Sequence, residues 1–122
     1  MDATFRILKL NNIAMAGLER LPRENYEISS EISRPDAVLL RSHDMHSMEL
    51  PSSILAVARA GAGVNNIPVD MLTQRGVPVF NAPGANANAV KELVLASMFL
   101  AARNLVDAAN YVRELSGSDE EV

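Results

Sequence analysis

The sequence has no cysteine and no tryptophan, and aromatic residues make up only 4% of its 122 residues. Without cysteine there is no disulfide and no need for an oxidising compartment. So few aromatic rings argue against a stacking platform for nucleic-acid bases. Basic residues are also in the minority, with 11 Lys and Arg against 15 Asp and Glu and a net charge of −4. This balance argues against a nucleic-acid partner, which requires a basic surface.

Targeting and membrane-spanning segments are also missing. Residues 1–12 contain no basic leader followed by an apolar core, so we expect no secretory signal. The most apolar run, Leu93–Ala102, is much shorter than the roughly 20 residues of a membrane span. We therefore expect a soluble cytoplasmic protein, and its length suffices for one domain with a core of its own.

Apolar patterning predicts alternating strands and helices along the chain. Strands are expected over residues 4–10, 26–29, 36–41, 54–60 and 77–80, and helices over 13–21, 68–75 and 87–115. Asn11 and Asn12 are expected to cap the first helix. The runs Asp36–Arg41 and Ile54–Ala60 are continuously apolar, which is typical of strands covered on both faces. The sequence therefore predicts an α/β fold with a five-stranded parallel sheet flanked by helices.

Two of the predicted strands end in turns rich in Gly, Pro and Asn. The first is Gly61–Asn66, with the sequence GAGVNN, and the second is Asn81–Gly84, with the sequence NAPG. Open parallel sheets bind their ligands at the carboxyl ends of the strands. We therefore expect the functional site at this edge.

Candidate anion ligands lie at the same edge. Arg41 and Ser42 follow the third strand, and an arginine with a neighbouring hydroxyl suits a carboxylate or a phosphate. The glycine turn Gly61–Gly63 lets backbone N–H groups approach an anion closely. A strand-to-helix turn without a ligand is an equal alternative from spacing alone. Arg59, at the end of a strand, is as consistent with a structural ion pair as with a ligand.

Two other interpretations of the polar residues are disfavoured. The glycine turn does not complete a dinucleotide fingerprint, because Asn66 replaces the third glycine and no acidic residue follows about 20 positions later. The cluster His43, Asp44, His46 and Glu49 does not have the spacing of a zinc site. We therefore expect a solvated loop there and no metal.

The long helix expected over residues 87–115 has no clean polar face. Between Leu93 and Ala102 only Ser97 is polar. A helix that is apolar all round is normally buried, and a domain of this size cannot easily bury a terminal helix on every side. We therefore expect a covering surface from another domain or from a second subunit.

The stretches RAGAGVNNI and RGVPVFNAPGANANAVKELV, with LLRS upstream, resemble the D-isomer-specific 2-hydroxyacid dehydrogenases. The resemblance is dense from Arg41 to about Arg103. It implies a flavodoxin-like substrate-binding domain over residues 1–85 and a crossover helix over 86–115 that serves the domain and dimer interfaces. Residues 116–122 would be a truncated linker, and the Rossmann domain of the family is absent from this sequence.

The resemblance also implies roles for individual residues. Substrate carboxylate or phosphate would bind Arg41, Ser42 and the backbone of Gly61 and Gly63. Ala62 would lie near the nicotinamide of NAD, and Asn86 would line the cleft. No catalytic residue is expected, because the histidines of this chain, His43 and His46, precede the glycine turn, whereas the catalytic histidine of the family follows it.

The expected function is thus the substrate-binding part of a NAD-dependent, homo-oligomeric dehydrogenase of a phosphorylated 2-hydroxy acid, inactive as this segment alone. Glycerate and hydroxypyruvate remain open as substrates. The alternative is a free-standing flavodoxin-like module that binds small anions or dimerises through the helix over 87–115.

Overall fold

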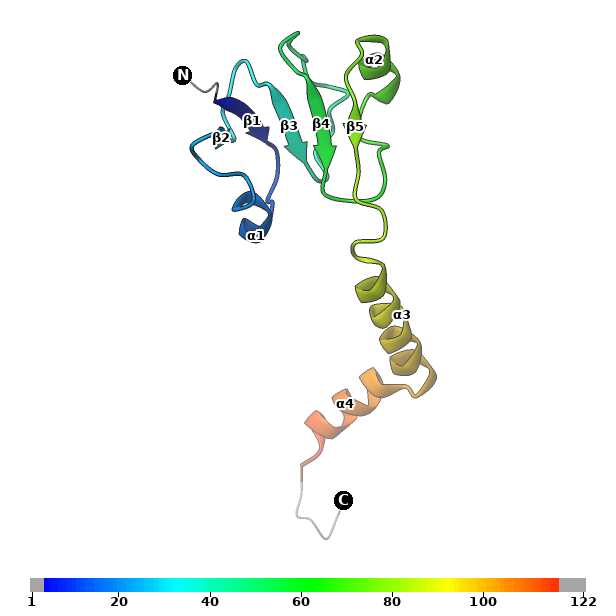
Figure 1. Cartoon of the computed structure of the whole chain (residues 1–122). Helices are drawn as coiled ribbons and strands as arrows, with labels where there is room; N and C mark the ends of the chain where they lie inside the picture. Colours follow the sequence, from blue (N-terminus) through cyan, green and yellow to red (C-terminus); the bar gives the residue numbers. More distant parts are fainter. Residues whose placement is uncertain (1–3, 117–122) are drawn as a thin grey trace. The chain divides into compact units, whose positions relative to one another are not determined.

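The chain divides after Ala85 into two compact units in the computed structural model, which describes residues 4–116. The first unit holds a β-sheet with helices α1 and α2, and the second holds helices α3 and α4 (Figure 1). Residues 117–122 of the predicted linker lie outside the described residues.

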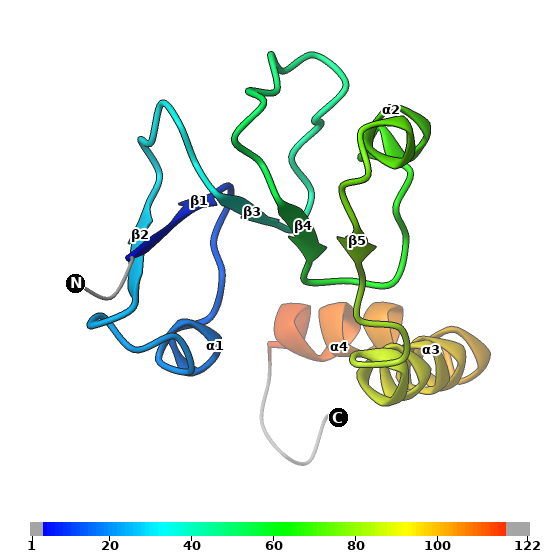
Figure 2. The same cartoon turned by 45° about the horizontal axis from the view of Figure 1, so that its top comes forward.

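The sheet has five strands in the order β2-β1-β3-β4-β5, and every pair is parallel (Figure 2). The strands are β1 (Phe5–Lys9), β2 (Tyr26–Ser29), β3 (Ala37–Leu40), β4 (Ala56–Arg59) and β5 (Val79–Phe80). The chain moves outward from β1 first to β2 and then, on the other side, to β3, which is the flavodoxin-like order. This confirms the predicted α/β fold and its parallel five-stranded sheet.

A row of apolar side chains crosses the sheet and fixes its register. Leu8 of β1 pairs with Val38 of β3, Val38 with Val57 of β4, and Val57 with Val79 of β5. The first three are buried, and Val38 and Val57 are almost completely so. Residues in register share one face of the sheet, so this row carries the main core. The core also contains Leu40, Met45, Ile54, Ile67, Leu72 and Val77.

The opposite face of the sheet is only half-buried, which corrects the prediction of strands covered on both faces. Ala37 and Leu39 in β3, and Ala56 and Ala58 in β4, are intermediate in burial. Helix α1 (Met15–Leu18) forms only one turn and lies beside β1 and β2 (Figures 1 and 2), so it does not extend over β3 and β4.

The two helices of the first unit differ in how well the sequence predicts them. Helix α1 covers four residues of the nine expected, and its N-cap is Ala14 without a side-chain hydrogen bond, so the predicted cap by Asn11 or Asn12 is wrong. Helix α2 (Val69–Gln74) follows Pro68 as expected. It stops before Gly76, which has φ +69° and so takes the left-handed conformation of a helix-terminating glycine.

The second unit consists of two helices where one was predicted. Helix α3 spans Ala87–Ala102 and helix α4 spans Leu105–Glu114. Asn104 separates them with φ +51°, a left-handed conformation that a continuous helix does not tolerate and that Asn adopts more readily than most residues. The prediction of an unbroken helix to about Leu115 was therefore wrong.

The apolar residues of the second unit are exposed. Helices α3 and α4 contain no buried residue, and Leu93 and Phe99 are 69% and 66% exposed. The other large apolar residues exposed on α3, α4 and their ends are Val90, Val94, Leu95, Met98, Leu100, Leu105, Val106, Tyr111, Val112 and Leu115. Within residues 4–116, no helix combines the length and the apolar character needed to cross a membrane.

Candidate functional site

The loops that follow β1, β3, β4 and β5 meet at the carboxyl edge of the sheet. Leu40 and Arg59, the last residues of β3 and β4, are paired in register. The loops after these two strands are therefore neighbours, and hydrogen bonds from side chains to backbone groups connect them. Of the residues predicted to form the site, the structure brings Arg41, Ser42 and Gly61–Gly63 together at this edge.

Asn11 holds the backbone of the loop after β3. Its Oδ1 atom accepts hydrogen bonds from the backbone N–H groups of Arg41 at 3.3 Å, Ser42 at 2.9 Å and His43 at 2.7 Å. Asn11 itself has φ +71°, a conformation that Asn tolerates better than most residues. The three N–H groups are thereby occupied and not available to a ligand.

Asn66 holds the same loop through its carbonyl groups. Its Nδ2 atom donates to the carbonyl oxygens of His43 at 2.7 Å and Arg41 at 3.3 Å. The backbone adds a third tie, from the N–H of the fully buried Met45 to the carbonyl of Asn66 at 2.9 Å. Asn66, which replaces the third glycine of the dinucleotide fingerprint, therefore has a structural role, because it joins the loop after β3 to the loop after β4.

Arg59 connects this loop to the glycine turn. Its Nε atom donates to the carbonyl of Arg41 at 2.7 Å, and its Nη1 atom donates to the carbonyl of Gly63. A guanidinium supplies several donors in a fixed plane, so it can bridge two acceptors. The predicted alternatives for Arg59, an ion pair or a ligand, are replaced by hydrogen bonds to two backbone carbonyls.

The turn after β5 is fastened to the other side of the glycine turn. The Nδ2 atom of Asn81 donates to the carbonyl of Ala62 at 2.7 Å, and the N–H of Ala82 donates to the carbonyl of Gly61 at 2.9 Å. The carbonyls of all three residues of the glycine turn are thus occupied.

Three consecutive N–H groups in and directly after the glycine turn, in contrast, remain free, whereas the N–H of Gly61 donates to the carbonyl of Arg59 at 2.9 Å. Within residues 4–116 the backbone N–H groups of Ala62, Gly63 and Val64 make no hydrogen bond, and Ala62 and Gly63 are exposed. Successive unpaired N–H groups in a turn are a common anion site. With the exposed side chains of Arg41 and Ser42 on the neighbouring loop, this edge offers donors from two sides to one anionic ligand.

The remaining predicted site residue, Asn86, belongs to the second unit. It is the N-cap of α3, and its carbonyl accepts from the N–H of Val90 at 3.0 Å. Its role in lining a cleft stays a prediction.

The histidines lie in the loop after β3. His46 Nε2 is 3.1 Å from the carbonyl oxygen of Asn65, so this nitrogen carries the proton when the hydrogen bond forms. Both histidines are exposed. In the part of the chain that the structure describes, no group of three or more His, Cys, Asp or Glu is arranged to hold a metal ion.

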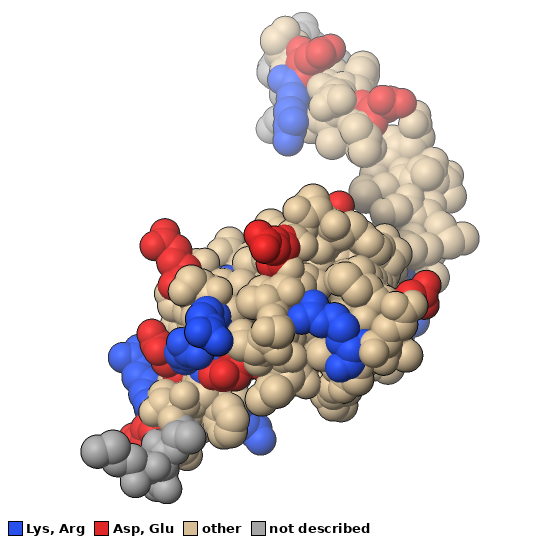
Figure 3. Space-filling model, turned by 90° about the horizontal axis from the view of Figure 1, so that it is seen from above, with Lys and Arg blue, Asp and Glu red and all other residues tan. Residues whose placement is uncertain are grey.

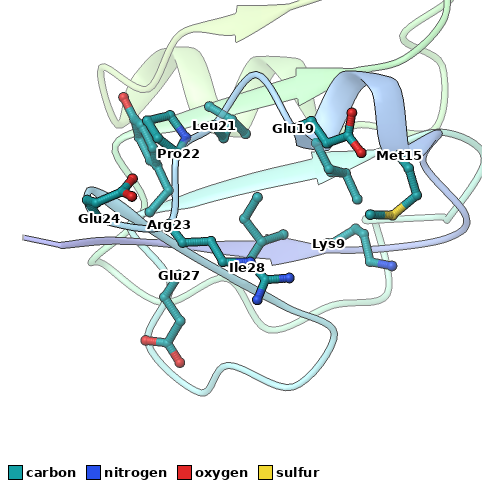
Figure 4. Close-up of a pocket in the computed structure, with 11 residues that line it drawn as sticks. Lys9, Met15, Glu19, Leu21, Pro22, Arg23, Glu24, Glu27 and Ile28 are labelled. Atoms are coloured by element: carbon teal, nitrogen blue, oxygen red, sulfur yellow. The ribbon is translucent and has the colours of Figure 1, made fainter.

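A hollow in the described residues lies elsewhere, beside α1, β1 and β2. It has a volume of about 790 Å³ and is lined by residues of β1, α1, β2 and the loop before β2 (Figure 4). Charged side chains of both signs line it, and Figure 4 labels Lys9 and Arg23 as well as Glu19, Glu24 and Glu27. None of the predicted site residues lines this hollow, so its size is no argument for placing the site there.

Basic and acidic residues are mixed on the side of the first unit that lies opposite the carboxyl edge of the sheet. Figure 3 looks from the side of the amino ends of the strands and shows basic and acidic side chains interspersed over the surface. A single-sign surface, such as a nucleic-acid partner would need, is not seen on this face.

Patterns in the sequence predicted a site at this edge, which stays a prediction, but they did not predict the hydrogen bonds by which Asn11, Asn66 and Asn81 hold the loops. The signal for Asn11 was present, since an asparagine directly after a strand is well suited to a left-handed position and to local backbone hydrogen bonding. It was assigned to the following helix, because the sequence does not show which loop lies beside which.

Comparison with known proteins identifies similar sequences. The family model described as D-isomer specific 2-hydroxyacid dehydrogenase, catalytic domain, matches residues 7–120. The chain is 35% identical to D-3-phosphoglycerate dehydrogenase of Archaeoglobus fulgidus over 91 residues, which are 72% of this chain and 17% of the relative. It is 36% identical to the protein of that name from a Synechocystis species over 91 residues, which are 72% of this chain and 16% of the relative.

A relative with a different name is also similar. The chain is 32% identical to hydroxypyruvate reductase of Thermotoga maritima over 94 residues, which are 75% of this chain and 31% of the relative. The chain therefore spans less than a third of the length of these three relatives.

The packing around the glycine turn gives a testable difference between its two glycines. A Cβ atom on Gly63 would lie 2.8 Å from Arg59 Nη1 and 3.2 Å from Asn65 Oδ1, whereas the nearest atom to a Cβ on Gly61 is 3.7 Å away. We expect Gly63→Ala to displace the Arg59 guanidinium and to be less stable than Gly61→Ala by about 1 kcal/mol, the typical net value of one hydrogen bond. Urea unfolding of both variants measures this difference. Equal free energies of unfolding would contradict the close approach.

Proposed function

The chain belongs to the D-isomer-specific 2-hydroxyacid dehydrogenases, and we propose that it is the substrate-binding part of a NAD-dependent D-3-phosphoglycerate dehydrogenase. The proposed reaction oxidises 3-phospho-D-glycerate to 3-phosphooxypyruvate, the step that opens serine synthesis. The single observation that supports a role in anion binding is the set of free N–H groups at Ala62, Gly63 and Val64 beside the loop of Arg41.

The two kinds of donor at this edge suit the two anionic groups of the proposed substrate. Every 2-hydroxy acid has a carboxylate, and backbone N–H groups of a turn bind such a group without a charged side chain. A phosphate carries more charge, and the planar guanidinium of an arginine matches its oxygens. We therefore assign the carboxylate to the glycine turn and the phosphate to Arg41, with the hydroxyl of Ser42 beside it.

NAD would accept the hydride from the substrate carbon that carries the hydroxyl group. The residues of this chain do not form a dinucleotide-binding site by themselves. Asn66 stands where the fingerprint needs its third glycine, and its amide is bonded to the carbonyls of Arg41 and His43. The proposed contact of this chain with the cofactor is therefore limited to the exposed Ala62 near the nicotinamide, and Asn86 is proposed to line the substrate cleft.

The role of Arg41 can be tested in the full-length gene product, meaning the complete reading frame that encodes these residues. We expect Arg41→Ala to raise KM for 3-phosphoglycerate at least about tenfold, because a charge-assisted contact to the phosphate is lost. The matched control is Arg20→Ala, which removes an exposed arginine that lies outside the loops of the candidate site. Steady-state NADH formation measures both variants. An unchanged KM in Arg41→Ala would refute this assignment.

The 122 residues alone are proposed not to turn over substrate. They contain no histidine after the glycine turn and no complete dinucleotide fingerprint. We expect no NADH formation from 3-phosphoglycerate and NAD with this chain, against clear activity of the full-length gene product. Turnover by the chain alone would contradict the proposal. A reading frame that encodes no further residues, combined with specific phosphate binding, would favour the alternative of a free-standing anion-binding module.

The exposed apolar surface of α3 and α4 supports a second part of the proposal, that copies of this protein associate through residues 87–115. Exposed apolar patches of this extent are typical of interaction sites, and Phe99 at 66% exposure is among the largest side chains on it. Burial of such a side chain contributes about 1.5–3 kcal/mol.

We therefore expect Phe99→Glu to shift the full-length gene product toward smaller assemblies, as measured by sedimentation velocity. Lys91→Glu is the matched control, because it places the same carboxylate at an exposed position of the same helix. A single unchanged sedimenting species in Phe99→Glu would remove α3 from the proposed interface.

A further inference from the structure

The loop that carries Arg41 and Ser42 depends on one residue outside the motifs of the family resemblance. Asn11 follows β1, and 30 positions separate it from Arg41 in the sequence. Nevertheless its Oδ1 atom accepts from three consecutive N–H groups, those of Arg41, Ser42 and His43. The three donors converge on a single carbonyl oxygen, which has two lone pairs. The backbone that carries these donors therefore curves tightly around this one atom.

We propose that Asn11 is a positioning residue of the anion site, which fixes the curve of this loop and thereby the place from which the Arg41 side chain meets the ligand. This inference rests on the proposed function. Asn11 is not proposed to touch the substrate, since its oxygen is occupied by the loop.

The hydrogen bonds continue from this loop into the glycine turn. The carbonyl of Arg41 accepts from Arg59 Nε at 2.7 Å, and Arg59 Nη1 donates to the carbonyl of Gly63. The N–H and the carbonyl of Arg41 are thus held from opposite sides, by Asn11 and by Arg59. A shift of the loop would move Arg41 relative to the free N–H groups of the turn, and a substrate with two anionic ends requires both at a fixed separation.

Asn11 also removes donors that would compete for an anion. The N–H groups of Arg41, Ser42 and His43 are adjacent in sequence, as are those of Ala62, Gly63 and Val64. If the first set were free, the edge would present two backbone anion sites. Because Asn11 occupies the first set, the backbone binds at the glycine turn and the loop after β3 contributes side chains.

The backbone conformation of Asn11 permits a substitution that removes the side chain and leaves the backbone in place. Its φ of +71° is adopted by Gly at no steric cost, so Asn11→Gly removes the acceptor and keeps the backbone. Asn11→Asp keeps an acceptor of the same reach, and Asp also tolerates this conformation. The matched control is Asn12→Gly, since Asn12 is exposed and its side chain makes no hydrogen bond within residues 4–116.

The experiment measures steady-state kinetics of the full-length gene product with 3-phosphoglycerate and NAD, together with the thermal midpoint of each variant. We expect Asn11→Gly to raise KM for 3-phosphoglycerate about tenfold, with KM for NAD and kcat changed by less than about twofold. Asn11→Asp is expected to restore KM to within about threefold of the wild-type value, and Asn12→Gly to leave it unchanged.

Two results would overturn the positioning role. The first is an unchanged KM in Asn11→Gly; together with a lowered thermal midpoint it would mark a purely structural residue. The second is an equal loss in Asn11→Asp, because the acceptor would then be irrelevant. A wild-type gene product without dehydrogenase activity would instead refute the proposed function. In that case, backbone amide NMR shifts of Arg41, Ser42 and His43 in Asn11→Gly would still test whether Asn11 holds the loop, with unchanged shifts counting against it.

Discussion

Hydrogen bonds from side chains to backbone groups hold the carboxyl edge of this sheet, and the candidate site depends on them. Loops leave the sheet with unpaired N–H and carbonyl groups that must find partners. Asn11 takes the N–H groups after β3, Arg59 and Asn66 take the carbonyls, and Asn81 takes a carbonyl of the glycine turn. The N–H groups of residues 62–64 are left without a partner among the described residues. The proposed anion site therefore lies where these loops leave backbone donors unpaired.

The apolar core determines which loops become neighbours. The row that runs from Leu8 through Val38 and Val57 fixes the register of three strands. A slip of one residue would turn every side chain of a strand to the other face, so this register is strongly specified. With the register fixed, Leu40 and Arg59 end side by side, and Arg59 reaches the carbonyl of Arg41. Residues without any ligand contact thus determine the spacing of those proposed to bind the ligand.

Local patterns in the sequence predicted the elements of the fold, whereas contacts between distant segments escaped prediction. Continuous apolar runs predicted the strands, and Pro68 and Gly76 predicted the limits of α2, because these signals act within a few residues. The side chain of Asn11 was assigned to a helix cap, although it bonds to a loop 30 or more positions away. Arg59 was assigned to a charge or a ligand, although it binds backbone carbonyls. In both cases the partner is a backbone group, which carries no sequence signature.

The helices of the second unit likewise leave groups without a partner, in their case apolar side chains. In α3 the run Leu93–Ala102 contains only one polar residue, Ser97, and α4, the helix that contacts it, leaves α3 without a single buried residue. Burial on folding is what stabilises most helices in proteins, so the proposed association through residues 87–115 would supply the burial that α3 lacks within its own unit. Helix α3 starts at Ala87, shortly after Ala82, whose N–H is bonded to the carbonyl of Gly61. The turn after β5, which is bonded to the glycine turn, therefore leads along the chain directly into the segment proposed to associate with a second copy.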